Sequence, residues 1–322
     1  MLALLRPGLI LLLASSLASA QEDDSTASRS QWFFGVGMGV ERFHWHETST
    51  DVWYYYSHVQ EKVTAAREGA SHRFVTENGN RFLPRILLEF RPNRMLSLTA
   101  NAKGITGTVG YVGGLQYDVE QLIEEGYKVD SAEFDGVTWV RGPVKALKSY
   151  TGYRGFQLGL EARVSDAMAV VAGRRVGLEG TAGCSFRSTR RLISYTNTRS
   201  AGYDEVWAIS WADLGLGAFV AFDRARLGAR WGLLVPLSTK ETIQEVYGGA
   251  DINRDGRYGF ETDIVPETRN GWRSSLYWER PEGLRLEFTW ETRSYGESPV
   301  NGGIMQPASL ESMGRLETTW LF

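Results

Sequence analysis

The sequence has almost no capacity for disulfide bonds, because Cys184 is the single cysteine among its 322 residues. Two cysteines are needed to close an intrachain bridge, so a disulfide-stabilised scaffold is excluded. The chain also lacks the long apolar run, of roughly 18 residues or more, that indicates a membrane-spanning helix. Basic residues are not in excess, since the formal net charge is -3. Nothing in this balance indicates a protein that binds nucleic acids or other polyanions.

The first twenty residues have the pattern of a secretory signal peptide. Arg6 precedes an apolar run at residues 9–13, and small residues end the segment at Ala18-Ser19-Ala20. A short apolar core followed by such a site is removed during export. We therefore expect a signal peptide at residues 1–20, a periplasmic linker at 21–30 and one folded domain at 31–322.

Aromatic residues are plentiful, at 12% of the chain, and many stand in segments where apolar and polar residues alternate. The segment LRLEFTWETR, residues 284–293, places Leu286, Phe288 and Trp290 on one face and Arg285 and Glu287 on the other. Alternation with period two indicates a strand that has one apolar face. A secreted β-sandwich shares this alternation, whereas tryptophans near strand ends favour a membrane barrel.

Ten such segments follow one another, and their connections alternate between short and long. Four short connections are expected near Pro92, Asp166, Arg224 and Glu282, with Ser165 to Ala167 as the second turn. Short turns at one end and long loops at the other are typical of outer-membrane barrels. The pattern predicts an all-β fold: a transmembrane antiparallel up-and-down β-barrel of about ten strands, with short periplasmic turns and long extracellular loops.

The last segment, LETTWLF, ends on an apolar residue, with Leu316, Trp320 and Phe322 on one face. It resembles the terminal strand of Gram-negative outer-membrane β-barrel proteins. The resemblance implies residence in the cell outer membrane and recognition of these three residues by the barrel-assembly machinery. An even strand count places both termini on the periplasmic side. Because the terminal strand closes the barrel against the first strand, we expect the two to pair near Val36.

The polar face of the strands carries charges of both signs and is expected to line the lumen. Charges in a space of low dielectric constant must be paired and hydrogen-bonded. The sequence therefore predicts an Arg/Glu network that fills the lumen, and a water-filled channel for small solutes is the alternative. The expected lumen residues are Glu41, Arg85, Glu89, Lys103, Glu161, Arg163, Arg175, Glu179, Arg230, Glu287, Arg293 and Arg315.

Two expected loops carry residues that suit ligands. GADINRDGRYGFETD contains the D-x-N-x-D-G start of a calcium loop, although Thr262 stands where the EF-hand pattern has glutamate. Its candidate ligands for Ca²⁺ are Asp251, Asn253, Asp255, Arg257 and Glu261. In another loop, guanidinium groups that suit the phosphates of lipopolysaccharide are expected at Arg187, Arg190, Arg191 and Arg199. Outer-membrane lipids and lipopolysaccharide are accordingly the expected partners.

Outer-membrane omptin proteases resemble this ten-strand architecture and use an Asp-Asp pair and an Asp-x-His pair. None of His44, His46, His58 and His72 has an aspartate two positions before it. The His-x-Ser pair of outer-membrane phospholipases is also missing from the sequence. We therefore expect a non-enzymatic barrel whose surface loops bind or shield, and a narrow channel and a surface hydrolase with a loop-borne site are the alternatives.

Overall fold

The computed structural model describes residues 30–57, 62–116, 130–134, 137–141, 144–194, 202–247, 257–280, 283–299, 301 and 306–322. The expected signal peptide and most of the expected linker lie outside these residues. Within them, no helix is long and apolar enough to cross a membrane.

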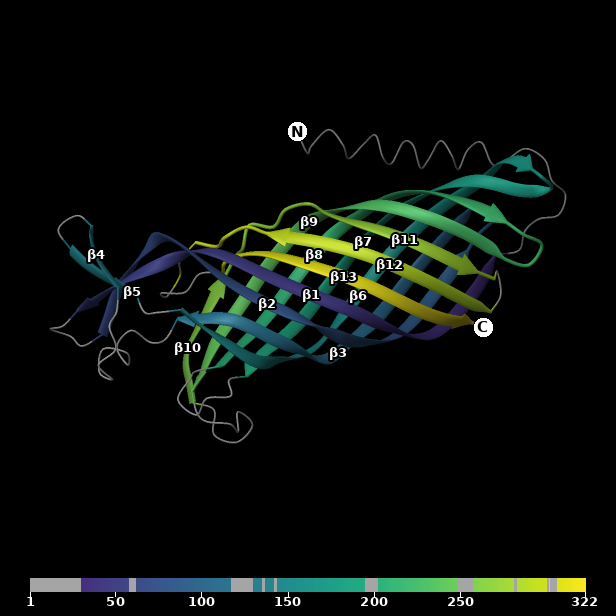
Figure 1. Cartoon of the computed structure of the whole chain (residues 1–322). Coiled ribbons are helices and arrows are strands. Elements are labelled where there is room, and N and C mark those ends of the chain that lie inside the picture. Colours follow the sequence, from purple (N-terminus) through teal and green to yellow (C-terminus); the bar gives the residue numbers. More distant parts are fainter. Residues whose placement is uncertain are drawn as a thin grey trace.

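Ten strands form a closed antiparallel ring in the order β1–β2–β3–β6–β7–β8–β9–β11–β12–β13, and pairing of β13 with β1 closes it (Figure 1). The predicted ten-strand barrel is therefore confirmed. The ring strands are β1 (Gln31–Ser57), β2 (Lys62–Arg91), β3 (Leu96–Gln116), β6 (Val144–Val171), β7 (Arg174–Ser194), β8 (Gly202–Ala221), β9 (Arg226–Tyr247), β11 (Gly271–Glu279), β12 (Leu284–Tyr295) and β13 (Ala308–Leu321).

The described residues also form three shorter strands that the sequence pattern did not predict. β4 (Asp130–Phe134) and β5 (Val137–Arg141) form a hairpin, which joins β1 where Val140 lies opposite Tyr54. β10 (Arg257–Ile264) pairs with β9. All three lie at the end of the barrel away from the C-terminus, which we call the loop end; the opposite end is the turn end (Figure 1).

Short connections at the turn end follow the predicted pattern, with one shifted position. Asn93 caps the β2–β3 turn, because its side-chain oxygen accepts hydrogen bonds from the backbone N–H groups of Met95 and Leu96 at 2.9 and 2.8 Å. The β6–β7 turn does not lie at Ser165 to Ala167. It is formed by Ala172 and Gly173, whose φ angles of 49° and 73° suit the mirror-image turn of a tight hairpin.

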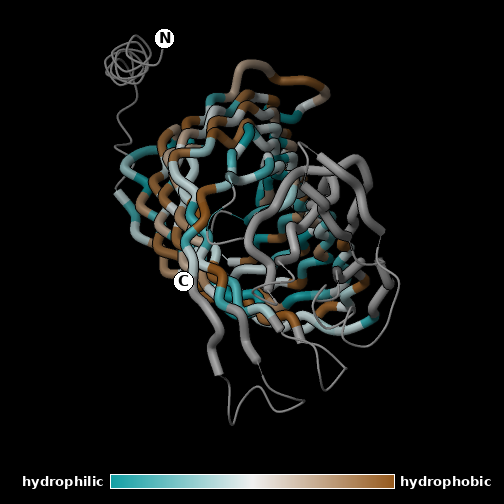
Figure 2. The backbone as a smooth tube through the Cα atoms, turned by 90° about the vertical axis from the view of Figure 1, so that its left-hand side faces the viewer, coloured by the Kyte–Doolittle hydropathy of each residue, from teal (hydrophilic) through white to brown (hydrophobic). Residues whose placement is uncertain are grey.

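The outer surface carries a band of apolar side chains. On β1 the residues Trp32, Phe34, Val36, Met38 and Val40 point outward and are 39–64% exposed. They span nine residues, and a tilted strand needs about 9–11 residues to cross a membrane. Figure 2 shows the resulting alternation of hydrophobic and hydrophilic positions along the strands. This band is the surface that a lipid bilayer would cover.

Polar residues replace the apolar ones on the outer face toward the loop end. Arg190 on β7 contacts Asp204 on β8, and Lys240 on β9 contacts Asp263 on β10 at 2.8 Å. Both partners of the second pair are 55% exposed at the side chain. The barrel wall therefore continues beyond the apolar band into water.

The terminal strand closes the ring in the expected register, because Trp320 lies opposite Val36. Phe34 and Phe322 exchange two backbone hydrogen bonds of 3.2 and 2.9 Å. The side chains of Leu316, Trp320 and Phe322 are 57%, 45% and 74% exposed and point outward. Their role as an assembly signal stays a prediction.

Deletion of Phe322 is expected to lower the yield of barrel in the outer membrane far more than it lowers stability. The residue is exposed and its removal costs only the two terminal backbone bonds to Phe34. Yield in membranes and refolding of purified chain into detergent would be compared. Trp32→Ala removes an equally outward aromatic from the same end and is the matched control. Equal yields for both variants would contradict the prediction.

Candidate functional site

Charged side chains line the interior of the barrel. Of the predicted lumen residues, seven are buried: Glu41, Arg85, Glu89, Arg163, Glu179, Arg293 and Arg315. Four more are partly buried and paired: Lys103, Glu161, Arg230 and Glu287. Arg175 is the exception, because the β6–β7 hairpin extends beyond the rim and leaves this residue exposed. The expectation of a lumenal Arg175 is therefore wrong.

Nearest the turn end, two carboxylates hold three guanidinium groups. Glu89 on β2 accepts hydrogen bonds from Arg285 on β12 and Arg91 at 2.9 and 2.7 Å. Glu279 on β11 lies 3.2 Å from a terminal nitrogen of Arg163 on β6 and 3.0 Å from Nε of Arg285. The Glu89–Arg285 and Glu279–Arg163 pairs join strands that are not neighbours in the ring, so these two pairs cross the lumen.

A chain of alternating charges crosses the middle of the barrel. It runs from Arg81 through Glu41, Arg315, Glu291, Arg293 and Glu311 to Arg187, and each carboxylate contacts two guanidinium groups of this chain. The last link is a fork in which both terminal nitrogens of Arg187 donate to Glu311 at 2.6 and 2.7 Å. Since β7 and β13 stand on opposite sides of the ring, this fork bridges the full lumen.

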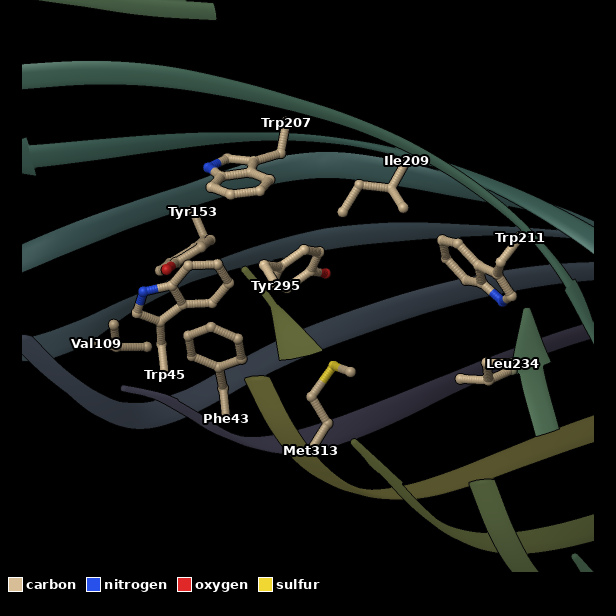
Figure 3. Close-up of a cluster of buried hydrophobic side chains, with 10 residues drawn as sticks. All are labelled: Phe43, Trp45, Val109, Tyr153, Trp207, Ile209, Trp211, Leu234, Tyr295 and Met313. Carbon is tan, nitrogen blue, oxygen red and sulfur yellow. The ribbon is translucent and has the colours of Figure 1, made fainter. Parts of the chain in front are cut away.

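An aromatic layer adjoins the alternating charges inside the barrel, and Figure 3 shows its ten side chains. It consists of Phe43, Trp45, Val109, Tyr153, Trp207, Ile209, Trp211, Leu234, Tyr295 and Met313, all at most 4% exposed. The rings of Trp45 on β1 and Trp207 on β8 meet edge to face, with centroids 5.3 Å apart. These two strands are also on opposite sides of the ring, so this contact spans the lumen as well.

Beyond the aromatic layer lies an acidic cluster, defined as Glu47, Glu77, Glu205, Glu241 and the single cation Arg191. The Arg191 guanidinium contacts Glu47, Glu77 and Glu205 at 2.9, 2.8 and 2.7 Å. Glu241 is 0% exposed and neither of its carboxylate oxygens has a hydrogen-bond partner. The cluster therefore has three more carboxylates than cations.

The acidic cluster lies above the apolar band, because its residues neighbour the outward charges Arg190, Asp204 and Lys240 in sequence. Burial raises the pKa of the Glu205 carboxyl to about 7, and Glu47 and Glu77 act in the same direction, whereas Arg191 opposes the shift. Burial, with the negative charge of Glu205 beside it, raises the pKa of Glu241 well above its usual range. Glu241 can therefore hold a proton near neutral pH.

The arginines expected to contact lipopolysaccharide separate into two groups. Arg187 and Arg191 point into the barrel, are 3% and 2% exposed and bind carboxylates, which corrects the expectation for these two residues. Arg190 points outward and donates to Asp204 at 2.8 Å. Arg199 lies outside the described residues. Lipopolysaccharide contact at Arg190 and Arg199 stays a prediction.

The calcium loop falls largely outside the described residues, which do not include Asp251, Asn253 and Asp255. The backbones of Arg257 and Glu261 belong to β10, but their side chains are not described. Elsewhere in the described part of the chain, no group of three or more His, Cys, Asp or Glu residues could hold a metal ion. The Ca²⁺ site therefore stays a prediction.

No protein-family model and no curated protein matches the sequence. Solved structures do show similarity in fold. The outer membrane protease OmpT from Escherichia coli is 8% identical, with 94% of this chain and 99% of that chain covered and a TM-score of 0.45. An outer membrane channel from Pseudomonas putida F1 is 13% identical, with 94% and 100% covered and a TM-score of 0.25. The Ralstonia pickettii toluene transporter TbuX is 10% identical, with 89% and 88% covered and a TM-score of 0.22.

The class of the protein follows from its own architecture. A closed antiparallel ring with an even number of strands, an outward apolar band and a polar interior defines an outer-membrane β-barrel. Backbone groups within a bilayer must be satisfied internally, and ring closure by β13 and β1 achieves this. The class-level resemblance seen in the sequence is thus confirmed.

Proposed function

We propose that this protein is a non-enzymatic outer-membrane barrel that does not conduct solutes and instead supports surface-exposed segments that bind or shield. One observation carries the proposal: side chains from opposite walls of the barrel touch at two heights. The Arg187–Glu311 fork is the first contact and the Trp45–Trp207 ring contact is the second. A solute would have to separate both to pass.

Energetics support a lumen that stays closed. Separating a buried ion pair leaves a charge without its partner in a medium of low dielectric constant, which typically costs about 3–5 kcal/mol per pair. The pairs along the lumen share members, because Arg315 contacts both Glu41 and Glu291. Opening one contact therefore disturbs the next, and the network resists stepwise separation.

Unequal strand lengths support the proposal that the barrel holds surface-exposed segments that bind or shield. β1 and β2 contain 27 and 30 residues, whereas β12 and β13 contain 12 and 14. At about 3.3 Å per residue, β1 and β2 extend far beyond the nine residues of the apolar band. Their upper parts pair with each other, and β5 adds to β1 there. We assign this loop-end extension to the cell exterior, where it can meet ligands.

Planar-bilayer recording tests the proposal against the alternative of a narrow channel. Purified wild-type protein is expected to give no discrete conductance steps, because both cross-lumen contacts block the path. Insertion is verified on the same preparation by the protease-resistant, heat-modifiable band of the folded barrel. Stepwise conductance from verified wild-type barrels would contradict the proposal and favour the channel.

A further inference from the structure

A polar cavity of about 70 Å³ lies inside the barrel between the turn-end charge pairs and the chain of alternating charges. Its lining includes the side chains of Arg85, Asn101, Lys103, Gln157 and Glu317. A buried water needs about 10–15 Å³ of such volume, so the cavity can hold one small ion together with a few waters.

Cations outnumber anions around this cavity. Seven cationic side chains line it: Arg85, Lys103, Arg163, Arg230, Arg273, Arg285 and Arg315. Four carboxylates line it: Glu161, Asp213, Glu287 and Glu317. Carboxylates farther away offset some of this excess, since Glu89 and Glu279 bind Arg163 and Arg285.

Cations still outnumber carboxylates when the count takes in all the described lumen charges below the aromatic layer, whereas the acidic cluster beyond that layer has the opposite excess. Below the aromatic layer, the described lumen holds twelve cations: Arg81, Arg85, Arg91, Lys103, Arg163, Arg187, Arg226, Arg230, Arg273, Arg285, Arg293 and Arg315. It holds ten carboxylates: Glu41, Glu89, Glu161, Glu179, Asp213, Glu279, Glu287, Glu291, Glu311 and Glu317. Cations therefore outnumber carboxylates by two in this part of the lumen, and charge held away from water requires a counter-charge.

Among the described cations that line the cavity, Arg85 is the one without a close partner. Its Nη1 lies 3.9 Å from Glu317, whereas the Lys103 ammonium occupies that carboxylate at 2.7 and 2.8 Å. Neither Nε nor Nη1 of Arg85 has a hydrogen-bond partner, although the residue is only 9% exposed. Two buried nitrogen donors of one guanidinium group therefore lie at the wall of the cavity without a hydrogen-bond acceptor. Water could accept their hydrogen bonds, but it would not balance the positive charge.

We propose that this cavity binds one small monovalent anion, chloride in an ordinary salt solution, beside the guanidinium of Arg85. The amide groups of Asn101 and Gln157 and the Lys103 ammonium supply further donors around the same space. Glu287 and Glu317 also line it and would repel a larger or doubly charged anion such as phosphate. The ion acts as a structural counter-ion of the lumen.

Diffraction from crystals of the full barrel grown in bromide tests the site directly. A bromide anomalous peak within hydrogen-bond distance of the Arg85 guanidinium is the expected result. Replacement of bromide by gluconate, which is too large for the cavity, should remove the peak. Crystals that hold only water at Arg85 in bromide would overturn the proposal. Conductance plays no part in this readout, so the result is independent of the proposed non-conducting function.

Thermal unfolding in detergent supplies a second test that uses no crystal. At constant ionic strength, exchange of gluconate for chloride is expected to raise the unfolding temperature of the wild type and then to saturate. Arg85→Gln should abolish this chloride-dependent rise, and Arg85→Lys should retain part of it. Arg42→Gln removes an outward, exposed arginine of the neighbouring strand and should leave the rise intact. The same temperature for wild type in chloride and in gluconate would overturn the proposal.

Discussion

Glu291→Ala is expected to destabilise the barrel by about 3–5 kcal/mol, the cost of removing one partner from a buried ion pair. Glu291 is 0% exposed and lies 3.0 Å from both Arg273 and Arg315, with Arg293 also in contact. Its removal leaves three guanidinium groups with fewer partners and removes one negative charge from the region below the aromatic layer, where cations already outnumber carboxylates. Glu291→Gln keeps the shape of the side chain and should cause a smaller loss.

Urea unfolding in lipid vesicles, followed by tryptophan fluorescence, measures this loss. Asp263→Ala breaks the exposed ion pair with Lys240, which is 2.8 Å long, and is the matched control. Exposed pairs contribute little because water and salt screen them. The midpoint of Asp263→Ala should therefore match that of the wild type. A Glu291→Ala midpoint that also matches the wild type would show that the lumen network does not stabilise the barrel.

Much of the barrel could be predicted from local pattern alone. A strand in a bilayer must alternate between a lipid-facing and an inward face, so period two fixes which residues point inward. The pattern predicts ten strands, the inward position of residues such as Glu41 and Arg315, and the pairing of the last strand with the first near Val36, where Trp320 lies in the structure. The strand count and the inward positions depend only on residues close in sequence. The pairing of Val36 with Trp320 follows once the last strand is assumed to close the ring against the first.

The misplaced β6–β7 turn shows where local pattern fails. Ser165, Asp166 and Ala167 are typical turn residues, yet they continue β6, and the register shift between Ala167 and Ala169 absorbs one extra residue. The Ala172–Gly173 turn lies several residues further along. Arg175 was placed in the lumen by the same error. A hairpin that extends beyond its neighbouring strands keeps the same alternation as a shorter one, so alternation alone does not locate its turn.

The aromatic layer was not predicted, although the sequence holds a signal for it. On β1 the apolar residues change parity, from the even position of Val40 to the odd positions of Phe43 and Trp45, without a register shift in the pairing with β2 between them. On β8, Trp207 and Trp211 point inward while Ala208 and Ala212 point outward. This change of parity marks the level along the barrel at which the outward residues become polar and the inward residues become apolar. Which side chains then meet across the lumen depends on barrel tilt, which no local pattern contains.

The acidic cluster leads to the second large prediction, a loss of stability as pH rises from about 5 to 8. Burial raises the pKa of Glu205 to about 7 and raises that of Glu241 well above its usual range, whereas the ordinary value is 4.5. The folded barrel thus binds protons at pH values where the unfolded chain has released them. This stability is fully present below about pH 4.5 and is lost as pH rises through the folded-state pKa values. The Glu205 shift alone corresponds to roughly 2–4 kcal/mol.

Glu241→Gln separates this effect from other titrations. The amide mimics the protonated carboxyl at any pH, so the variant should match the wild type near pH 5 and exceed it in stability near pH 8. Urea midpoints measured across this pH range give both results.

The charged groups around Glu241 influence its pKa. Glu205, Glu47 and Glu77 add negative charge, and Arg191 alone opposes them. Asp263→Asn removes one carboxylate from the exposed outer face and should leave the pH slope unchanged, because the pKa of Asp263 is lowered from 3.8, below this range. Parallel slopes for Glu241→Gln and wild type would mean that Glu241 carries no proton in the folded barrel. Its unpartnered oxygens would then require a bound cation, because a buried carboxylate without a proton or a counter-charge is too costly to maintain.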